Sequence, residues 1–224
     1  MIKKKVPRIL ALIPARAGSK RLKKKNILEF NGLPLIAWTI NSALKSKYIS
    51  KVIISSDDPT VHKLSEDFPS VFIIKRPIAL ASDQASSSDV ALHALNCFPD
   101  YDYLILLQPT SPLRDSHDID SAIEYLIERQ ARSCFSLCKA VAGDKNLCIL
   151  KASGYFQKKI QNFLPIPSLH TINGAIYINN IQDFRQSKKF ITQSSVGYVM
   201  PQSKSIDIDT IDDFRAAEQI KVTL

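Results

Sequence analysis

The first half of the chain alternates short apolar runs with helical stripes, and no other feature limits its fold as strongly. Four apolar or β-branched runs have the length of buried strands: 9–13, 51–56, 71–74 and 103–107. Three stretches between them carry apolar residues at helical spacing: 35–45, 59–68 and about 87–97. Strands that alternate with helices predict an α/β fold, with a mostly parallel sheet and helices on both of its faces.

The second half is expected to continue this sheet, with one interruption. Helices are expected at 118–130 and about 210–220, and strands at 133–138, 173–179 and 196–200. Residues 139–172 are less regular, and their apolar residues look exposed, for example Tyr155, Phe156 and Phe163. We interpret residues 1–224 as one domain with an insertion at about 139–172 that makes an oligomer contact.

The loop that follows the first apolar run is small and basic. Neither Gly18 nor Ser19 carries bulk, so a ligand can approach the backbone closely. Four cations surround this backbone: Arg16, Lys20, Arg21 and Lys25. Backbone N–H groups ringed by Arg and Lys suit phosphate oxygens, which predicts a triphosphate site at the C-terminal end of the first strand. The loop matches neither the P-loop nor the G-x-G-x-x-G motif, and a solvated loop without a ligand is the alternative.

The positive charge of the chain is concentrated at its start. The formal net charge is +9, and the first 25 residues hold ten Lys or Arg and no Asp or Glu, while the remainder is nearly balanced. Such a cluster points to a polyanionic ligand at one site or to nucleic acid. A nucleic-acid-binding protein would show strong salt dependence and no need for Mg²⁺. Because the chain lacks clustered aromatic residues for stacking on bases, we expect no nucleic acid.

The sequence indicates a cytoplasmic protein that has no membrane partner. Every apolar stretch is shorter than the roughly 18 residues of a membrane span. Arg8, Pro14 and Arg16 interrupt the apolar segment that a signal peptide would need. The four cysteines form no CxxC pair, so we expect buried thiols and no zinc site.

Three further stretches carry polar residues suited to a ligand. Serines at 86–88 can cap a helix whose N-terminus faces an anion, and the turn at 108–114 follows the most apolar strand. A merely well-capped helix and a rigid double-proline turn are the alternatives. Asp207 and Asp209, if extended, project to one side and suit Mg²⁺ with substrate phosphates, although Asp209 could instead cap the last helix with Thr210. A basic loop together with a carboxylate pair suggests nucleotidyl transfer.

Five ordered blocks of the sequence resemble the acylneuraminate cytidylyltransferases, also called CMP-sialic acid synthetases. The blocks are 13–20 with Lys25-Asn26, then 76–87, 106–114, 173–178 and 205–210. The resemblance implies a nucleotide-diphospho-sugar-transferase-like, Rossmann-like three-layer fold and a homodimer. It also implies that CTP and a nine-carbon 2-keto sugar acid react to give a CMP-sugar and pyrophosphate. The insertion at 139–172 would then serve the dimer or the sugar end of the site.

The resemblance assigns a role to each matching residue. The CTP phosphates would be held by Arg16, Ser19, Lys20, Lys25 and Asn26. The cytidine end would contact Arg76 and Ser87, and the sugar would contact Gln108, Tyr177 and Phe190. Asp207 and Asp209 would bind Mg²⁺. The catalytic residues would be Arg16, Lys25 as the cation closest to the reacting group, and Asp209, which would help to deprotonate the anomeric hydroxyl.

The chain departs from the family pattern at the sugar end. Segment 161–165 lacks an arginine that many members carry, and a paired aromatic is reduced to Phe190 followed by Ile191. A less polar pocket favours legionaminate or pseudaminate over N-acetylneuraminate as the sugar. A Kdo-type cytidylyltransferase and a non-catalytic homologue are alternatives. The block at 108–114 and the Ser-Ile-Asp-Ile-Asp segment disfavour the first, and the presence of Lys25 and both aspartates disfavours the second.

Overall fold

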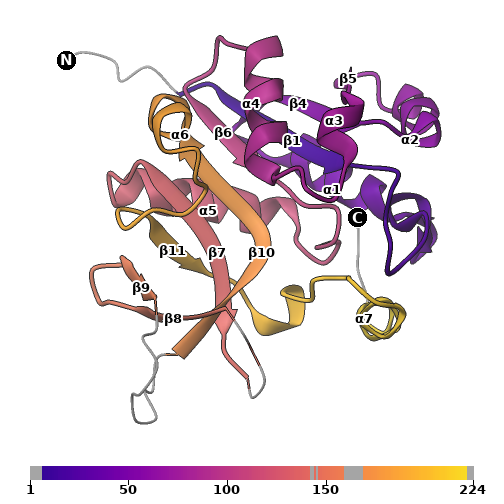
Figure 1. Cartoon of the computed structure of the whole chain (residues 1–224). Coiled ribbons are helices and arrows are strands. Elements are labelled where there is room, and N and C mark those ends of the chain that lie inside the picture. The colour runs from indigo at the N-terminus through magenta and orange to yellow at the C-terminus, as the bar shows by residue number, and fades with distance from the viewer. Residues whose placement is uncertain (1–6, 142–143, 145, 159–168, 221–224) are drawn as a thin grey trace.

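A computed structural model describes residues 7–141, 144, 146–158 and 169–220 (Figure 1). Seven strands of its main sheet lie in the order β11-β7-β10-β6-β1-β4-β5. Their bounds are Ile9–Ala15 (β1), Ile49–Ser56 (β4), Val71–Lys75 (β5), Tyr103–Leu106 (β6), Ser133–Lys139 (β7), Leu169–Asn180 (β10) and Val196–Val199 (β11). β10 is antiparallel to both β6 and β7, and the other neighbours on this path are parallel. The mostly parallel sheet that the sequence predicts is confirmed.

Helices cover both faces of the sheet, as expected. The helices α1 (Leu35–Lys45), α2 (Pro59–Leu64) and α5 (Ser116–Glu128) pack on one face, and α4 (Ser87–Cys97) and α6 (Ile181–Ser187) pack on the other. Figure 1 shows α4 and α6 in front of the sheet. α6 has no counterpart among the predicted helices.

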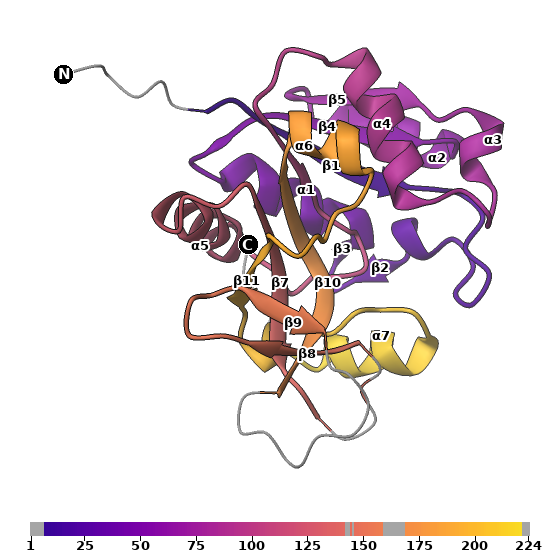
Figure 2. The ribbon, with the colours of Figure 1, turned by 60° about the vertical axis from the view of Figure 1, so that its left-hand side comes forward.

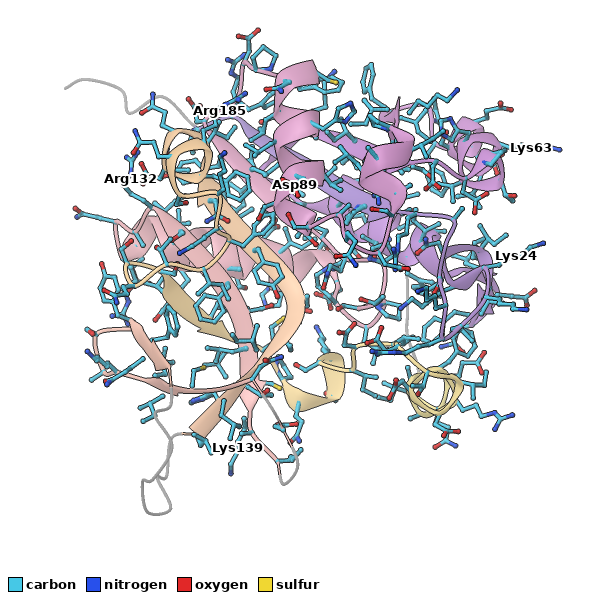
Figure 3. The ribbon with its side chains drawn as sticks, in the orientation of Figure 1. Lys24, Lys63, Asp89, Arg132, Lys139 and Arg185 are labelled. Carbon is cyan, nitrogen blue, oxygen red and sulfur yellow. The ribbon has the colours of Figure 1, made fainter. Side chains whose placement is uncertain are left out.

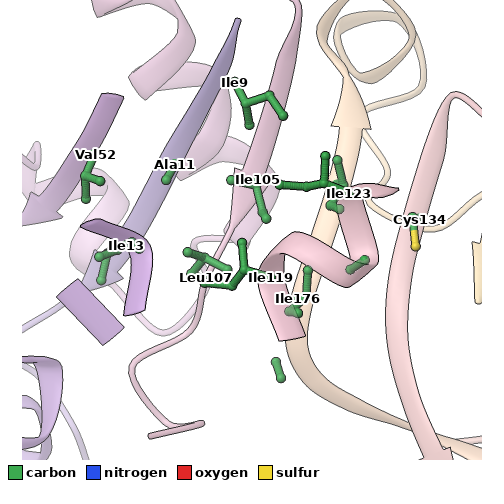
Figure 4. Packing of buried hydrophobic residues seen from close by; sticks show 14 of the residues in the cluster. Ile9, Ala11, Ile13, Val52, Ile105, Leu107, Ile119, Ile123, Cys134 and Ile176 are labelled. Atoms are coloured by element: carbon green, nitrogen blue, oxygen red, sulfur yellow. The ribbon is translucent and has the colours of Figure 1, made fainter. Parts of the chain in front are cut away.

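β1 lies in the middle of this three-layer core. Its odd-numbered residues, from Ile9 to Ala15, join the cluster under α1 and α5, part of which Figure 4 shows. Its even-numbered Leu10 and Leu12 join the cluster under α4 and α6. Because both faces of β1 are buried, an uninterrupted apolar run forms this strand, as is typical of parallel sheets.

Polar caps set the start of three helices. Ser86 and Asp89 form a capping box at the start of α4, where Figure 3 labels Asp89. Asp115 and Asp118 form another, so α5 begins at Ser116, two residues before the predicted start. Thr210 caps α7 (Ile211–Glu218). The predicted helix 59–68 is shorter than expected, since α2 gives way to the 3-10 turn η2 (Ser65–Asp67).

The described part of 139–172 is more regular than its sequence indicates. β8 (Leu147–Leu150) pairs with the first residues of β10, and β9 (Phe156–Lys158) pairs with β8. Figures 1 and 2 place this extension at the opposite end of β10 from α6. Tyr155 is 36% exposed, whereas the ring of Phe156 packs edge-on against Phe135. Phe163 and segment 161–165 lie outside the described residues.

A small hairpin supports the beginning of α1. β2 (Glu29–Phe30) and β3 (Leu33–Pro34) are joined by Asn31 and Gly32, both with positive φ, as a two-residue hairpin turn requires. Phe30 accepts a hydrogen bond from the indole of Trp38 and packs against Phe214 of α7. Ile208 is buried in the same cluster, which therefore anchors the segment that carries the two aspartates.

Three of the four cysteines are buried free thiols, and Cys97 is exposed, which corrects the expectation that all are buried. Cys97 is the last residue of α4, on the solvent side of that helix.

Within the described ranges, no helix combines the length and apolarity that a membrane span requires.

Candidate active site

A cavity of about 580 Å³ opens at the carboxyl end of β1, beside the turn that follows β6. All seven residues predicted to bind a nucleotide line it: Arg16, Ser19, Lys20, Lys25, Asn26, Arg76 and Ser87. Gln108 and Asp209 line the same cavity. The site therefore lies at the carboxyl edge of the parallel strands, where open α/β sheets place their ligands.

Two carboxylates hold the four cations of the basic loop. Asp83 forms ion pairs with Arg16 (2.9 Å) and Lys20 (2.6 Å), and these two cations hold the pKa of Asp83 below its ordinary value, Lys20 most strongly. Asp209 forms ion pairs with Arg21 (2.8 Å) and Lys25 (3.1 Å). The loop thus faces the cavity with its positive charge already arranged.

Lys25 is the most deeply placed of these cations. Its side chain is only 12% exposed, and its Nζ also donates a hydrogen bond to the carbonyl of Ile208 at 2.7 Å. Lys24, its neighbour, lies at the outer surface instead (Figure 3). The difference arises because Lys25 begins the 3-10 turn η1 (Lys25–Ile27), while Lys24 precedes that turn with a positive φ.

The backbone of the loop is held by side chains outside the strand. The N–H of Ala17 donates to Asp57, and the amide of Asn26 donates to the carbonyl of Arg16, each at 3.0 Å. A Cβ added to Gly18 would meet no protein atom within 4 Å, so the space beside this glycine is open to a ligand. These contacts fix the loop without covering it.

Arg76 and the start of α4 form the opposite wall. The Arg76 side chain donates to the hydroxyl and the carbonyl of Ser55, at 3.2 and 2.8 Å. Burial, with a contribution from the charge of Arg16, lowers the pKa of Arg76 to about 10. Ser87 is the first residue of α4, so it lies at the positive end of that helix dipole.

Asp207 and Asp209 lie near each other on a segment without regular secondary structure. Ile208 anchors this segment, because its side chain is buried and its N–H donates to the carbonyl of Thr110. Asp207 is an exposed residue, yet the protein around its carboxylate, with a contribution from the charge of Asp209, raises its pKa. Thr210 and Asp213 cap α7 by themselves, so the side chain of Asp209 is free to face Lys25.

The carboxylate pair fits a divalent cation that is also bound by a substrate. Among the described residues, no group of three or more acidic, histidine or cysteine side chains comes together. A hard cation such as Mg²⁺ needs only one or two carboxylates when phosphates and water complete its shell. Asp207 and Asp209 supply that number, although only Asp209 lines the cavity.

The predicted sugar contacts are divided between the cavity and the wall behind it. Gln108 lines the cavity, but Tyr177 and Phe190 do not. The ring centroids of Tyr177 and Phe190 lie 5.6 Å apart. The ring of Phe190 also packs on Phe184 of α6, with 4.7 Å between the centroids. Burial, together with the charge of Asp207, raises the pKa of Tyr177 to about 12, so its hydroxyl stays protonated near that carboxylate.

Sequence reasoning misses two site residues and undervalues a third. Asp83 and Thr110 line the cavity, and although they lie in the blocks 76–87 and 106–114, the sequence analysis assigns a role to neither. A sequence signal for Asp83 does exist, because it is the acidic residue in the serine-rich segment 82–88. In the structure this residue faces the basic loop. Arg21 is recognisable as a charge of the loop, but its pairing with Asp209 depends on a contact across 188 residues that no local pattern reveals.

Comparisons with known proteins confirm the resemblance and the fold. The cytidylyltransferase family matches residues 10–193. An N-acylneuraminate cytidylyltransferase of Escherichia coli O18:K1:H7 is 35% identical over 96% of the chain. The match covers 52% of that relative, so the chain spans about half of its length. A CMP-N,N'-diacetyllegionaminic acid synthase of Legionella pneumophila is 32% identical over 95% of the chain and 96% of its own length.

A solved structure shares the fold with little sequence identity. It is a CMP:2-keto-3-deoxy-manno-octonic acid synthetase complexed with CTP, which superposes with a TM-score of 0.72. The match covers 95% of the chain and 97% of that structure at 16% identity. At this level the likeness establishes the three-layer architecture alone.

Proposed function

The chain belongs to the cytidylyltransferase family, and we propose that it activates a nine-carbon 2-keto sugar acid with CTP. In this reaction the anomeric hydroxyl oxygen attacks the α-phosphorus of CTP and forms a new P–O bond. The bond between the α-phosphorus and its bridging oxygen breaks, and pyrophosphate leaves. One observation carries the proposal: a single cavity gathers the basic loop, Arg76, Ser87, Gln108 and Asp209.

The basic loop would bind the triphosphate and stabilise the charge that develops during transfer. Arg16, Lys20 and Arg21 are held at the cavity by carboxylates that more highly charged phosphates can replace. Lys25 is the least exposed cation and would lie closest to the α-phosphate. Fixed cations in a partly enclosed site stabilise phosphoryl oxygens more strongly than water does.

Asp207 and Asp209 would hold Mg²⁺ together with the phosphates of CTP. The ion would neutralise charge on phosphate oxygens as the P–O bonds change. Asp209 would also accept the proton of the anomeric hydroxyl, since its carboxylate faces the cavity beside Lys25. No enzyme nucleophile is required, because the sugar supplies the attacking oxygen.

The remaining residues would select the base and the sugar. Arg76 and Ser87 would face the cytidine, and the Gln108 amide would donate to and accept from the sugar. Tyr177 and Phe190 would support the sugar end from behind as a largely apolar wall. Such a wall favours N-acylneuraminate-type acids with deoxy positions, legionaminate or pseudaminate, over N-acetylneuraminate.

We propose a cytoplasmic homodimer that binds no nucleic acid and no membrane, with the described extension β8–β9 near its sugar end or dimer contact. Analytical ultracentrifugation gives the oligomeric state. Titration with duplex DNA and RNA at low salt tests the absence of nucleic-acid binding.

Pyrophosphate release tests the reaction itself. CTP and Mg²⁺ are incubated in parallel with N-acetylneuraminate, legionaminate, pseudaminate and Kdo. We expect release with one nine-carbon acid, its loss with EDTA, and none with ATP or GTP. Release with Kdo alone would mean that the sugar is Kdo and not a nine-carbon acid. A chain that binds no CTP would refute the proposed role of the basic loop.

A further inference from the structure

Arg114 is a charged side chain that the proposed reaction does not use, although the protein buries it completely. Its exposed fraction is 0%, and no carboxylate of the described residues lies within ion-pair distance of it. Burial lowers its pKa to about 10, against the weaker opposing effect of Asp118 and Asp115. A buried cation is destabilising unless hydrogen bonds compensate it, so its partners indicate what it is for.

The guanidinium joins three separate parts of the fold. Nη1 donates to the carbonyl of Ala175 on β10 at 2.9 Å and to the carbonyl of Gln108 at 3.3 Å. Nη2 donates to the hydroxyl of Thr39 on α1 at 2.8 Å. The backbone of Arg114 is also tied to α1, because Ser42 donates to its carbonyl. A planar fork can reach these acceptors together, whereas a lysine ammonium cannot reproduce the arrangement.

Two of these acceptors flank the place where the Gln108 amide lies. The register of β10 with β7 shifts between Ile172 and Tyr177, and Gly174 lies inside that irregularity with a φ of 77°. A Cβ at Gly174 would lie 2.9 Å from Oε1 of Gln108 and 3.6 Å from Oδ2 of Asp207. The backbone at 174–175 and the turn at Gln108 are therefore in close contact, and the Arg114 fork holds one to the other.

We propose that Arg114 is a positioning residue that sets the Gln108 amide at the sugar end of the cavity by joining its carbonyl to that of Ala175. The inference rests on the proposed function, because that function gives Gln108 a sugar to bind. It assigns Arg114 no contact with either substrate. Its effect should appear in the recognition of the sugar and leave CTP binding unchanged.

Three variants separate positioning from general stability. Arg114→Lys keeps the charge and removes the fork. Thr39→Val keeps the shape of a buried side chain and removes one acceptor of the fork, together with the 3.5 Å hydrogen bond that this hydroxyl donates to the carbonyl of Gln108. Ser133→Ala is the matched control, because it removes a buried hydroxyl contact with Ser195 at the far end of β7. Thermal unfolding of all three measures the stability that each substitution removes.

Steady-state kinetics with CTP and the nine-carbon acid that the wild type turns over best provides the first readout. For Arg114→Lys we expect the KM of the sugar to rise about tenfold, the loss of roughly one well-made hydrogen bond. The Kd of CTP, from calorimetry with Mg²⁺, should stay within about twofold of the wild-type value. Thr39→Val should shift the same KM in the same direction, and Ser133→Ala should not. The inference would be overturned if the KM of the sugar and the Kd of CTP shifted equally. It would also be overturned if the KM of the sugar stayed unchanged in both Arg114→Lys and Thr39→Val.

The side-chain amide signals of Gln108 in an NMR spectrum provide a readout that needs no turnover. They are assigned by their loss in Gln108→Leu. We expect them to report an ordered amide in the wild type and in Ser133→Ala, and a mobile one in Arg114→Lys and Thr39→Val. If the wild type turns over no sugar, the proposed function fails, and these signals still decide the role of Arg114. Unchanged signals in both test variants would refute it.

Discussion

Replacing Lys25 with methionine removes one charge from the cavity and leaves the shape of the side chain almost unchanged. In the wild type, Nζ of Lys25 lies 2.7 Å from the carbonyl of Ile208 and 3.1 Å from Oδ1 of Asp209. If Lys25 stabilises charge on the α-phosphate, its loss should lower kcat about 10²–10³-fold, the effect of removing one preorganised donor. This corresponds to about 2.7–4 kcal/mol of transition-state stabilisation.

The same substitution should have a smaller effect on folding. A hydrogen bond from a charged donor contributes about 1.5–3 kcal/mol, and the methionine stem retains the packing of the lysine stem. We expect a net loss of about 1–2 kcal/mol, which lowers Tm by about 2–8 °C in a chain of this size. Domains have about 5–15 kcal/mol of stability, so the variant stays folded at 25 °C and the lost rate reflects chemistry.

The assay is pyrophosphate release at saturating CTP, with Lys24→Met as the control. Lys24 is adjacent in sequence and equally charged, but it lies at the outer surface. The Lys24→Met variant should therefore release pyrophosphate at the wild-type rate. Wild-type kcat in Lys25→Met, or an equal loss in Lys24→Met, would refute the placement of Lys25 at the reacting phosphate.

Three further outcomes follow from the structure. Asp209→Ala should fold but lose Mg²⁺-dependent turnover, which circular dichroism and pyrophosphate release measure together, and a normal rate would remove the metal assignment. Gly174→Ala places a Cβ 2.9 Å from Oε1 of Gln108 at a φ of 77°, so it should cost about 1–3 kcal/mol of stability and weaken sugar binding; an unchanged Tm and KM would contradict this. At about pH 8 a thiol reagent should label Cys97 rapidly and the three buried cysteines only after unfolding, because burial raises the pKa values of the buried thiols. Mass spectrometry identifies the labelled site.

Most of the sheet is predictable from the sequence because its strands are buried on both faces. The run at β1 and the capping serines of α4 are local signals, and the structure places both elements where these signals indicate them. The direction of β10 is not predictable in this way, since periodicity shows that a strand forms but not how it pairs. The early start of α5 depends on Asp115 acting as its cap, a role that the apolar pattern of the helix does not indicate.

The site is predictable to a similar extent and for related reasons. The basic loop is contiguous in sequence, so its residues can be grouped by their spacing alone. Asp83 and Arg114 cannot be assigned in this way, because their roles arise from contacts with residues far along the chain. A fully buried arginine in particular contradicts the usual preference of that residue for the surface, and only its three acceptors explain it.

The ion pair between Lys25 and Asp209 joins positions 184 residues apart, which has a consequence for a chain made from its N-terminus. The basic loop leaves the ribosome long before Asp209, the more distant of the two carboxylates that hold it. Asp83 emerges in between and can pair with Arg16 and Lys20 at that stage. Lys25 has to wait for Asp209, so the cavity acquires this second carboxylate only after the preceding 208 residues have been synthesised.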